Sequence, residues 1–227
     1  MLTAELELLR PRLLPEVAAW RAEHPDGAAT LFGSAGAGLV LGFLSLHLDE
    51  PCTMSELELR TGMSYDSVHR AVRRLEQSGL IAVDAGPRTL SVSMPRSPLA
   101  MPVRCLTLAE GPIASALRWL RSVHGDGAVS EAFVFGSVAR GDETASSDLD
   151  AFVVTDLPQV EVSRALRGLS DMLRREIVSV VRTPAHVAAR RAAGYGFYRS
   201  VYDGPRIPLA PRMHAVDEHS AAALAGA

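Results

Sequence analysis

The sequence predicts a mixed α+β protein, in which a small helical unit with a hairpin precedes a second unit built on a small mixed sheet. Of the 227 residues, 48% are hydrophobic and 22% are charged, a composition typical of chains that fold around a core. Residues 39–94 combine three helical patterns with two short alternating stretches. From residue 113 onwards, strand patterns alternate with helical ones, which favours a sheet flanked by helices.

The chain begins with a predicted helical leader, residues 1–27. Apolar residues recur at helical spacing from Leu6 to Ala22, and a His-Pro-Asp-Gly turn signal closes the segment. The next stretch, Ala28 to Leu48, has no Asp, Glu, Lys or Arg and is long enough to cross a bilayer. Its glycine, serine and histidine residues dilute it, and the pattern that follows needs its second half as a core helix. We therefore expect no membrane partner.

The net charge and the cysteines of the chain restrict its partners and its cellular compartment. A formal net charge of -3 excludes a protein that coats nucleic acid with its whole surface, although it permits a local basic face. Cys52 and Cys105 match no metal-ligand spacing and form no disulfide framework, and the chain does not open with a secretory signal. The histidines form no ligand cluster either. These observations predict a cytoplasmic protein.

Residues 28–97 form the first predicted domain. Three helices are expected in it, with serine residues capping the second and third. Alternating residues between 80 and 94, with a turn at 85–87, predict a hairpin after them. The predicted helices are Leu39–Leu48, a helix capped by Ser55 that ends at Thr61, and a helix capped by Ser64 that ends near Gly79.

This order of helices and hairpin resembles a winged helix-turn-helix domain, with Met63 to Val68 opening the recognition helix and Leu75 to Ile81 leaving it. The resemblance implies DNA binding through the third helix, where arginine and histidine side chains provide positive charge. The alternatives are a solvated helix face and a docking module. The candidate DNA-binding residues are Ser64, Tyr65, Ser67, His69, Arg70, Arg73 and Arg74.

The second predicted domain covers residues 113–209. Prolines in and before residues 98–112 predict a linker, and an amphipathic helix then runs from Ile113 to Val123. A helix is expected at 162–174, another begins at Thr183, and the last residues, 210–227, are predicted to form a flexible tail. The predicted strands of this domain are Glu131–Phe135, Leu149–Val154 and Ile177–Val181.

The residues best suited to chemistry follow the first two of these strands. Gly136-Ser137 can turn the backbone sharply at a helix start, where free amides, the helix dipole and the serine hydroxyl favour a phosphate. Asp148 and Asp150 lie two residues apart, so they project from the same face of their strand and can hold divalent cations. Arg140, one helical turn after Gly136, can face the same phosphate or support the loop.

Together, Gly136-Ser137, Arg140-Gly141 and Ser147-Asp148-Leu149-Asp150 resemble the motif of minimal nucleotidyltransferases of the DNA polymerase beta superfamily. The resemblance implies that Gly136, Ser137 and Arg140 bind a nucleoside triphosphate, and that Asp148 and Asp150 bind Mg²⁺ or Mn²⁺ and are catalytic.

The sequence departs from this family where a third carboxylate would help to deprotonate the acceptor hydroxyl. The expected position holds Val178, which is apolar. Glu176 precedes Val178 by two residues, so the two side chains would lie on the same face of the strand. Glu176 becomes a candidate catalytic residue if the strand begins earlier. A solvated charge at a helix end is the favoured interpretation of Glu176, because Arg174 and Arg175 precede it.

Three functions are compatible with these patterns. The first is an enzyme that transfers a nucleoside monophosphate from a nucleoside triphosphate to an unidentified RNA, protein or small-molecule acceptor. The second is a DNA-binding transcriptional regulator whose transferase domain only binds nucleotide, in keeping with Val178. The third is an antitoxin-type nucleotidyltransferase with a helical RNase toxin as its partner. A dimer is compatible with each. The aromatic run from Tyr195 to Tyr198 suits base stacking, but packing of a terminal helix is the favoured interpretation.

Overall fold

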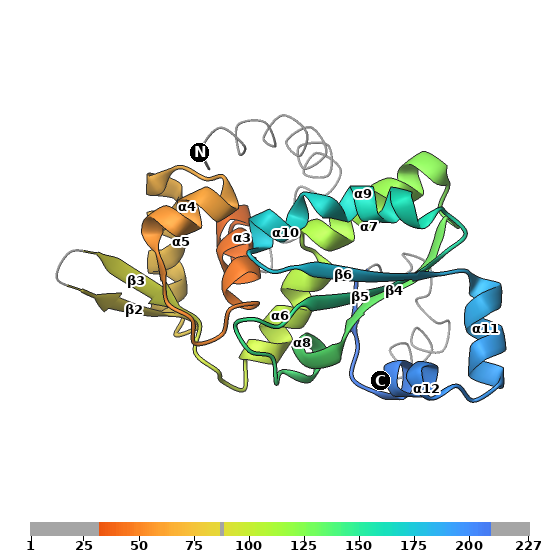
Figure 1. The fold of residues 1–227 in the computed structure, drawn as a ribbon. Helices are drawn as coiled ribbons and strands as arrows, with labels where there is room; N and C mark the ends of the chain where they lie inside the picture. The colour runs from red at the N-terminus through yellow and green to blue at the C-terminus, as the bar shows by residue number, and fades with distance from the viewer. Residues whose placement is uncertain (1–31, 87–88, 210–227) are drawn as a thin grey trace, which may run out of the picture.

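A computed structural model of the chain describes residues 32–86 and 89–209. The predicted leader and tail, and Pro87 of the predicted turn, lie outside these residues. The described chain forms an α+β structure with two small sheets, one in each of two units that lie side by side (Figure 1). Within the described ranges, no helix is both long enough and apolar enough to cross a membrane.

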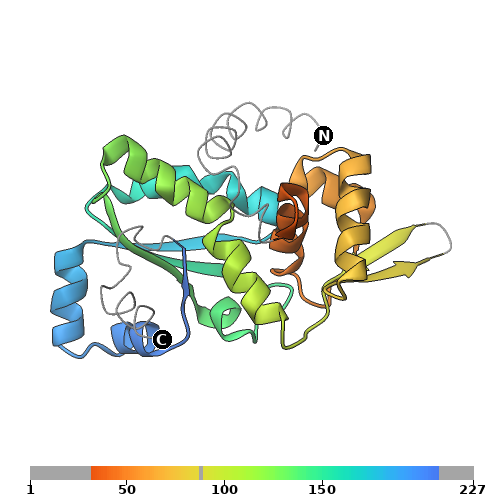
Figure 2. The same ribbon diagram turned by 180° about the vertical axis from the view of Figure 1, so that it is seen from behind.

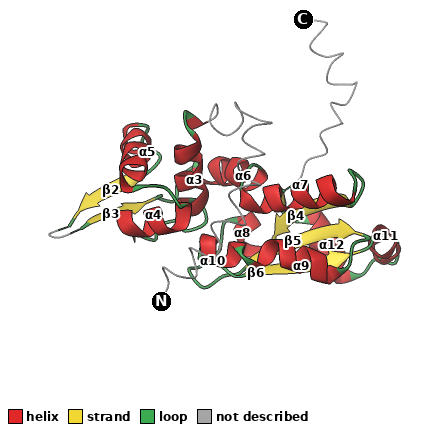
Figure 3. Cartoon of the chain, turned by 90° about the horizontal axis from the view of Figure 1, so that it is seen from above, coloured by secondary structure: helices red, strands yellow, loops and turns green. Residues whose placement is uncertain are grey.

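The first unit contains three helices and a three-stranded sheet of order β1-β3-β2. Strands β2 and β3 form a hairpin that points away from the second unit (Figure 3). Short strand β1 pairs with β3 on its other side, and this pairing was not predicted. The elements are α3 (Ala35–Leu44), β1 (Cys52–Thr53), α4 (Met54–Thr61), α5 (Tyr65–Gln77), β2 (Ala82–Ala85) and β3 (Leu90–Ser93).

Two helix boundaries in this unit differ from the prediction. Helix α3 begins earlier than the predicted Leu39, because the Ser34 hydroxyl accepts a hydrogen bond from the Ala37 amide and caps it. Ser55 does not cap α4. That role belongs to Thr53, whose hydroxyl accepts from the Glu56 amide at 3.1 Å and whose strand β1 leads directly into the helix.

The second unit has a four-stranded sheet of order β6-β5-β4-β7, with β5 and β6 parallel and the other pairs antiparallel. The helix expected at 162–174 is two helices, which meet at Gly168. The elements are α7 (Pro112–His124), β4 (Val129–Phe135), α8 (Gly136–Arg140), β5 (Leu149–Thr155), α9 (Gln159–Arg167), α10 (Leu169–Leu173), β6 (Ile177–Arg182), α11 (Pro184–Ala192), α12 (Gly196–Asp203) and β7 (Ile207–Pro208).

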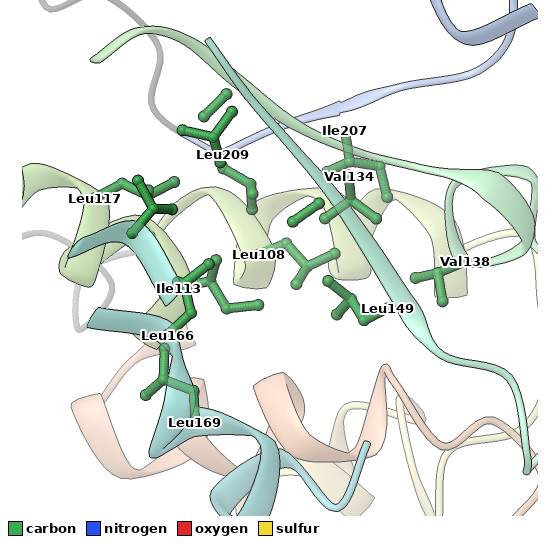
Figure 4. Packing of buried hydrophobic residues seen from close by; sticks show 14 of the residues in the cluster. Leu108, Ile113, Leu117, Val134, Val138, Leu149, Leu166, Leu169, Ile207 and Leu209 are labelled. Carbon is green, nitrogen blue, oxygen red and sulfur yellow. The ribbon is translucent and has the colours of Figure 1, made fainter. Parts of the chain in front are cut away.

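The two faces of this sheet are covered differently. Helices α7 and α9 pack on the face that carries Val134, Leu149 and Val153, and Figure 4 shows this core from close by. The opposite face carries Phe133 and Phe152, and α11 and α12 cover part of it. Because strand residues alternate between faces, Asp150 lies on the same face as Phe152.

Residues 98–112, predicted as a linker, contain a ten-residue helix, α6 (Ala100–Ala109). It lies between the two units (Figure 2). Ala100 and Val103 belong to the core of the first unit, whereas Leu108 belongs to the core of the second. Arg104, fully buried in the middle of α6, donates hydrogen bonds to carbonyl oxygens of both units, Ser45 at 2.7 Å and Val138 at 2.9 Å. The segment is therefore shared structure and does not act as a spacer.

Charged side chains also join the two units. Arg174, at the end of α10, forms ion pairs of 2.7 Å with Glu50 and Glu56 of the first unit. His47 is buried, and its ring lies 2.7 Å from the carbonyl oxygen of Leu173. Burial lowers the pKa of His47 below its usual range. These contacts fix how the winged helix sits against α10.

Candidate active site

Gly136 stands at the turn between β4 and α8, and its backbone has a left-handed φ of +73°. A β-carbon on this residue would lie 2.3 Å from Oδ2 of Asp150. The reason is the strand pairing, since Phe135 is the partner of Asp150 across β4 and β5. Glycine therefore meets two demands at once, a left-handed turn and room for a carboxylate. The structure thus places the Gly-Ser turn and Asp150 in contact.

The two aspartates lie at the start of β5. Asp148 is exposed and directly precedes the strand, whereas Asp150 is partly buried. Burial and the negative charge of Asp148 raise the pKa of Asp150, and the positive charge of Arg140 partly opposes this shift. Two neighbouring carboxylates suit a divalent cation, which accepts oxygen ligands and neutralises both charges. The donor set therefore fits such a metal.

A third protein carboxylate does not join this pair. Strand β6 lies beside β5 with Val178 as the partner of Asp150 and Ile177 as the partner of Leu149. The earlier strand start that would bring Glu176 beside Asp150 is not observed, and the Glu176 carbonyl instead accepts from the Leu149 amide. Among the described residues, no three His, Cys, Asp or Glu side chains are grouped to hold a metal. Within residues 32–86 and 89–209, the site thus offers two carboxylates.

Helix α8 positions the remaining candidates. The carbonyl oxygen of Ser137 accepts hydrogen bonds from the amides of Gly141 and Asp142, which closes the short helix. The Ser137 hydroxyl makes no hydrogen bond within the described part of the chain, so it is free to bind a ligand. Arg140 is half exposed and donates to Asp142 at 3.0 Å. Its positive charge favours the ionised form of Asp150, which lowers the pKa of that carboxyl against the effect of burial.

The loop from α8 to β5 is anchored by arginines that the sequence did not single out. Buried Glu143 pairs with Arg104 through both oxygens, at 2.6 and 3.0 Å. Arg96, from the segment after the hairpin, donates to the carbonyl oxygens of Gly141 and Glu143. Arg175 donates to the carbonyl oxygen of Ser147, directly before Asp148. The loop between the two motifs is therefore held from the segment after the hairpin, from α6 and from the segment that joins α10 to β6.

Arg174 and Arg175 entered the sequence analysis only as neighbours of Glu176, but both contact other parts of the protein. Arg175 is 5% exposed and Arg174 bridges the two units. Only a run of two arginines before a strand could have drawn attention to them, and such a run is usually a surface feature.

The predicted DNA-binding residues lie on α5 or at its start. Arg70 and Arg73 are exposed, and Tyr65 is exposed and stacks on His69 with ring centroids 6.0 Å apart. Ser64 begins the helix without a side-chain cap, and its hydroxyl donates to that of Ser67. Arg74 differs from the rest, because its guanidinium donates to the carbonyl oxygen of Gly33 at 2.6 Å and so secures the start of α3.

Comparison with known protein families identifies both units. Residues 35–88 match the MarR family, and residues 113–193 match the nucleotidyltransferase domain. The chain therefore joins a MarR-type winged helix to a nucleotidyltransferase domain, as the sequence motifs suggested. No curated protein and no solved structure matches the chain.

Proposed function

We propose that this chain, in which a MarR-type winged helix precedes a nucleotidyltransferase domain, is a metal-dependent enzyme that transfers a nucleoside monophosphate from a nucleoside triphosphate. The observation that carries the proposal is the contact of Asp150 with the Gly136 turn. It supports the proposal because Ser137 and the two aspartates, for which the sequence motif implies phosphate and metal binding, then lie at one edge of the sheet.

Each residue of the site has a distinct role in the proposed reaction. The free Ser137 hydroxyl and the amides that begin α8 bind the triphosphate, and Arg140 adds positive charge beside it. Asp148 and Asp150 would hold Mg²⁺ or Mn²⁺. A bound cation supplies neutralising charge on the phosphorus oxygens. The anchored loop from Gly141 to Ser147 fixes the distance between the serine and the aspartates.

The test is label transfer with the full chain. The protein is incubated with each of the four nucleoside triphosphates, labelled at the α-phosphate, with Mg²⁺ or Mn²⁺ and a cell extract. Asp148→Asn/Asp150→Asn is expected to abolish labelling. The matched control is Asp84→Asn/Asp126→Asn, which removes two exposed carboxylates elsewhere in the described chain and should label like wild type. Equal labelling by both double variants refutes the proposal.

Val178 favours a second candidate, a DNA-binding regulator whose transferase domain binds nucleotide without transferring it. A general base contributes about 10²–10⁴-fold to a rate, so its absence from β6 predicts slow or no transfer. The variant Val178→Asp separates the candidates, because it restores a carboxylate beside Asp150 at an exposed position. Faster transfer by Val178→Asp supports the enzyme. Metal-dependent nucleotide binding without transfer, in both wild type and variant, supports the regulator.

We further propose that the winged helix binds DNA through Arg70 and Arg73, with Tyr65, Ser67 and His69 near them. The variant Arg70→Gln/Arg73→Gln is expected to weaken binding of genomic fragments and to reduce the salt slope by up to about 2, since each lost phosphate contact removes about one unit. Arg164→Gln/Arg167→Gln is the control, with the same spacing on exposed positions of α9. Equal slopes for the two variants would assign α5 to packing or docking.

A further inference from the structure

A cavity of about 570 Å³ lies beyond the candidate active site, between the end of β6 and helices α11 and α12. Its volume falls in the range of small-molecule sites. It is lined by Arg182, His186, Arg190, Tyr195, Phe197 and Tyr198. The lining contains no carboxylate.

The basic side chains of the cavity come from the end of β6 and from helix α11. Arg182 ends β6, and His186 and Arg190 follow one turn apart on α11. Neither Arg182 nor Arg190 has a carboxylate partner within the described part of the chain. The Arg190 guanidinium instead lies over the ring of Tyr195, 4.2 Å from its centroid. The cavity therefore offers two guanidinium groups without carboxylate partners, which suit a phosphate.

The aromatic groups do not all serve the core, as the favoured interpretation of this run expected. Tyr198 is 6% exposed and packs on Phe152, but Tyr195 and Phe197 are exposed by 49% and 46%. Exposed rings beside guanidinium groups are a common platform for the bases of single-stranded nucleic acid.

Phe197 also connects the cavity with the candidate active site. Its ring lies 6.2 Å from Phe135, the residue before Gly136, and 6.5 Å from Phe152, two residues after Asp150. Val178 and Arg182 share one face of β6, four residues or about 13 Å apart. At about 3.4 Å per nucleotide, the spacing of a strand in a double helix, this span holds at most roughly four nucleotides, and fewer of an extended strand.

We propose that this cavity binds single-stranded nucleic acid, holding a base and its phosphate a few nucleotides from a strand end that reaches Asp150. Because this assignment rests on the proposed transferase, it names the acceptor as a nucleic-acid strand. Tyr195 and Phe197 stack on the base, and Arg182 and Arg190 pair with the backbone phosphate.

The test measures binding of fluorescein-labelled five-nucleotide RNA and DNA strands by anisotropy in EDTA. Every protein carries Arg70→Gln/Arg73→Gln, which removes the two exposed arginines proposed to bind DNA. Tyr195→Ala/Phe197→Ala is expected to weaken binding about tenfold or more, because each stacked base contributes strongly. Arg190→Gln, which keeps the rings, is expected to weaken binding and to lower the salt slope by about 0.7. Arg164→Gln/Arg167→Gln serves as the control on α9 and should bind unchanged.

Several outcomes would overturn the proposal. These are equal affinity in the cavity variants and the α9 control, competition by AMP as strong as that by the unlabelled strand, and binding that requires Mg²⁺ and the two aspartates. The assays distinguish a failure of the proposed enzyme from a failure of the proposed strand-binding cavity. Strand binding without aspartate-dependent transfer refutes only the enzyme, whereas aspartate-dependent transfer to another acceptor without strand binding refutes only the cavity.

Discussion

The contact between Gly136 and Asp150 leads to a sharp prediction for Gly136→Ala. Alanine at a left-handed φ of +73° costs about 1–2 kcal/mol. The new β-carbon would stand 2.3 Å from Oδ2, so the carboxylate must move by about 1 Å to reach an ordinary contact distance. Cγ and Cβ of Asp150, at 3.3 and 3.5 Å, limit the room for a simple rotation. A displacement of about 1 Å at a reacting group lowers a rate by about 100-fold.

The control is Gly62→Ala. Gly62 ends α4 with a φ of +65°, and a β-carbon there meets nothing within 4 Å. Both variants therefore carry the same backbone cost and are expected to lower the melting temperature by a few degrees. Only Gly136→Ala is expected to lose about 100-fold in label transfer, or a corresponding share of metal-dependent nucleotide binding. If the two variants keep similar transfer and binding, the position of Asp150 against the turn has no functional importance.

Three further predictions concern buried charge and thiols. Arg104→Met is expected to cost about 3–5 kcal/mol in urea unfolding, because it leaves buried Glu143 with only the ion pair to Arg96 at 3.6 Å, and Arg104→Met/Glu143→Leu to recover part of this loss; additive losses would contradict the pairing. Because the folded pKa of Asp150 is raised, its ionised form opposes folding above that pKa. In EDTA at pH 7, Asp150→Asn should therefore melt above wild type, with no difference below about pH 3; a lower melting temperature at pH 7 refutes this. Burial raises the pKa of Cys52 to about 12, so iodoacetamide at pH 8 should label Cys105 first, as mass spectrometry can check.

Local patterns predicted most elements, because periodicity and caps act within a few residues. The recognition helix, the hairpin and three strands of the second sheet follow from this kind of signal. Helix α6 was missed because Pro98 and Pro102 indicated a linker. Pro102 lies in the first turn of α6, where its missing amide hydrogen has no intrahelical acceptor to lose. Strand β7 is only two residues long and depends on β4 for its existence.

The candidate site, too, was predicted only in part from the sequence. The spacing of Gly136, Ser137, Asp148 and Asp150 was visible, and the resemblance to the family indicated Val178 as the residue beside the aspartates, where β6 pairs it with Asp150. The anchoring of the intervening loop was not visible. Arg104 and Glu143 are separated by 39 residues, and nothing in either neighbourhood indicates that both are buried. Such a pair arises from tertiary packing, for which a single sequence carries no local signal.

The position of α6 between the two units has a consequence for how the protein loses its structure. One end of this helix completes the core around α3, and the other completes the core around α7. Melting α6 would open both cores and release the loop before Asp148, since Arg104 would leave Glu143. We therefore expect helix α5 and the sheet edge that carries Asp148 and Asp150 to unfold as one cooperative unit. A single calorimetric transition, shared by the two units, is the thermal signature of that arrangement.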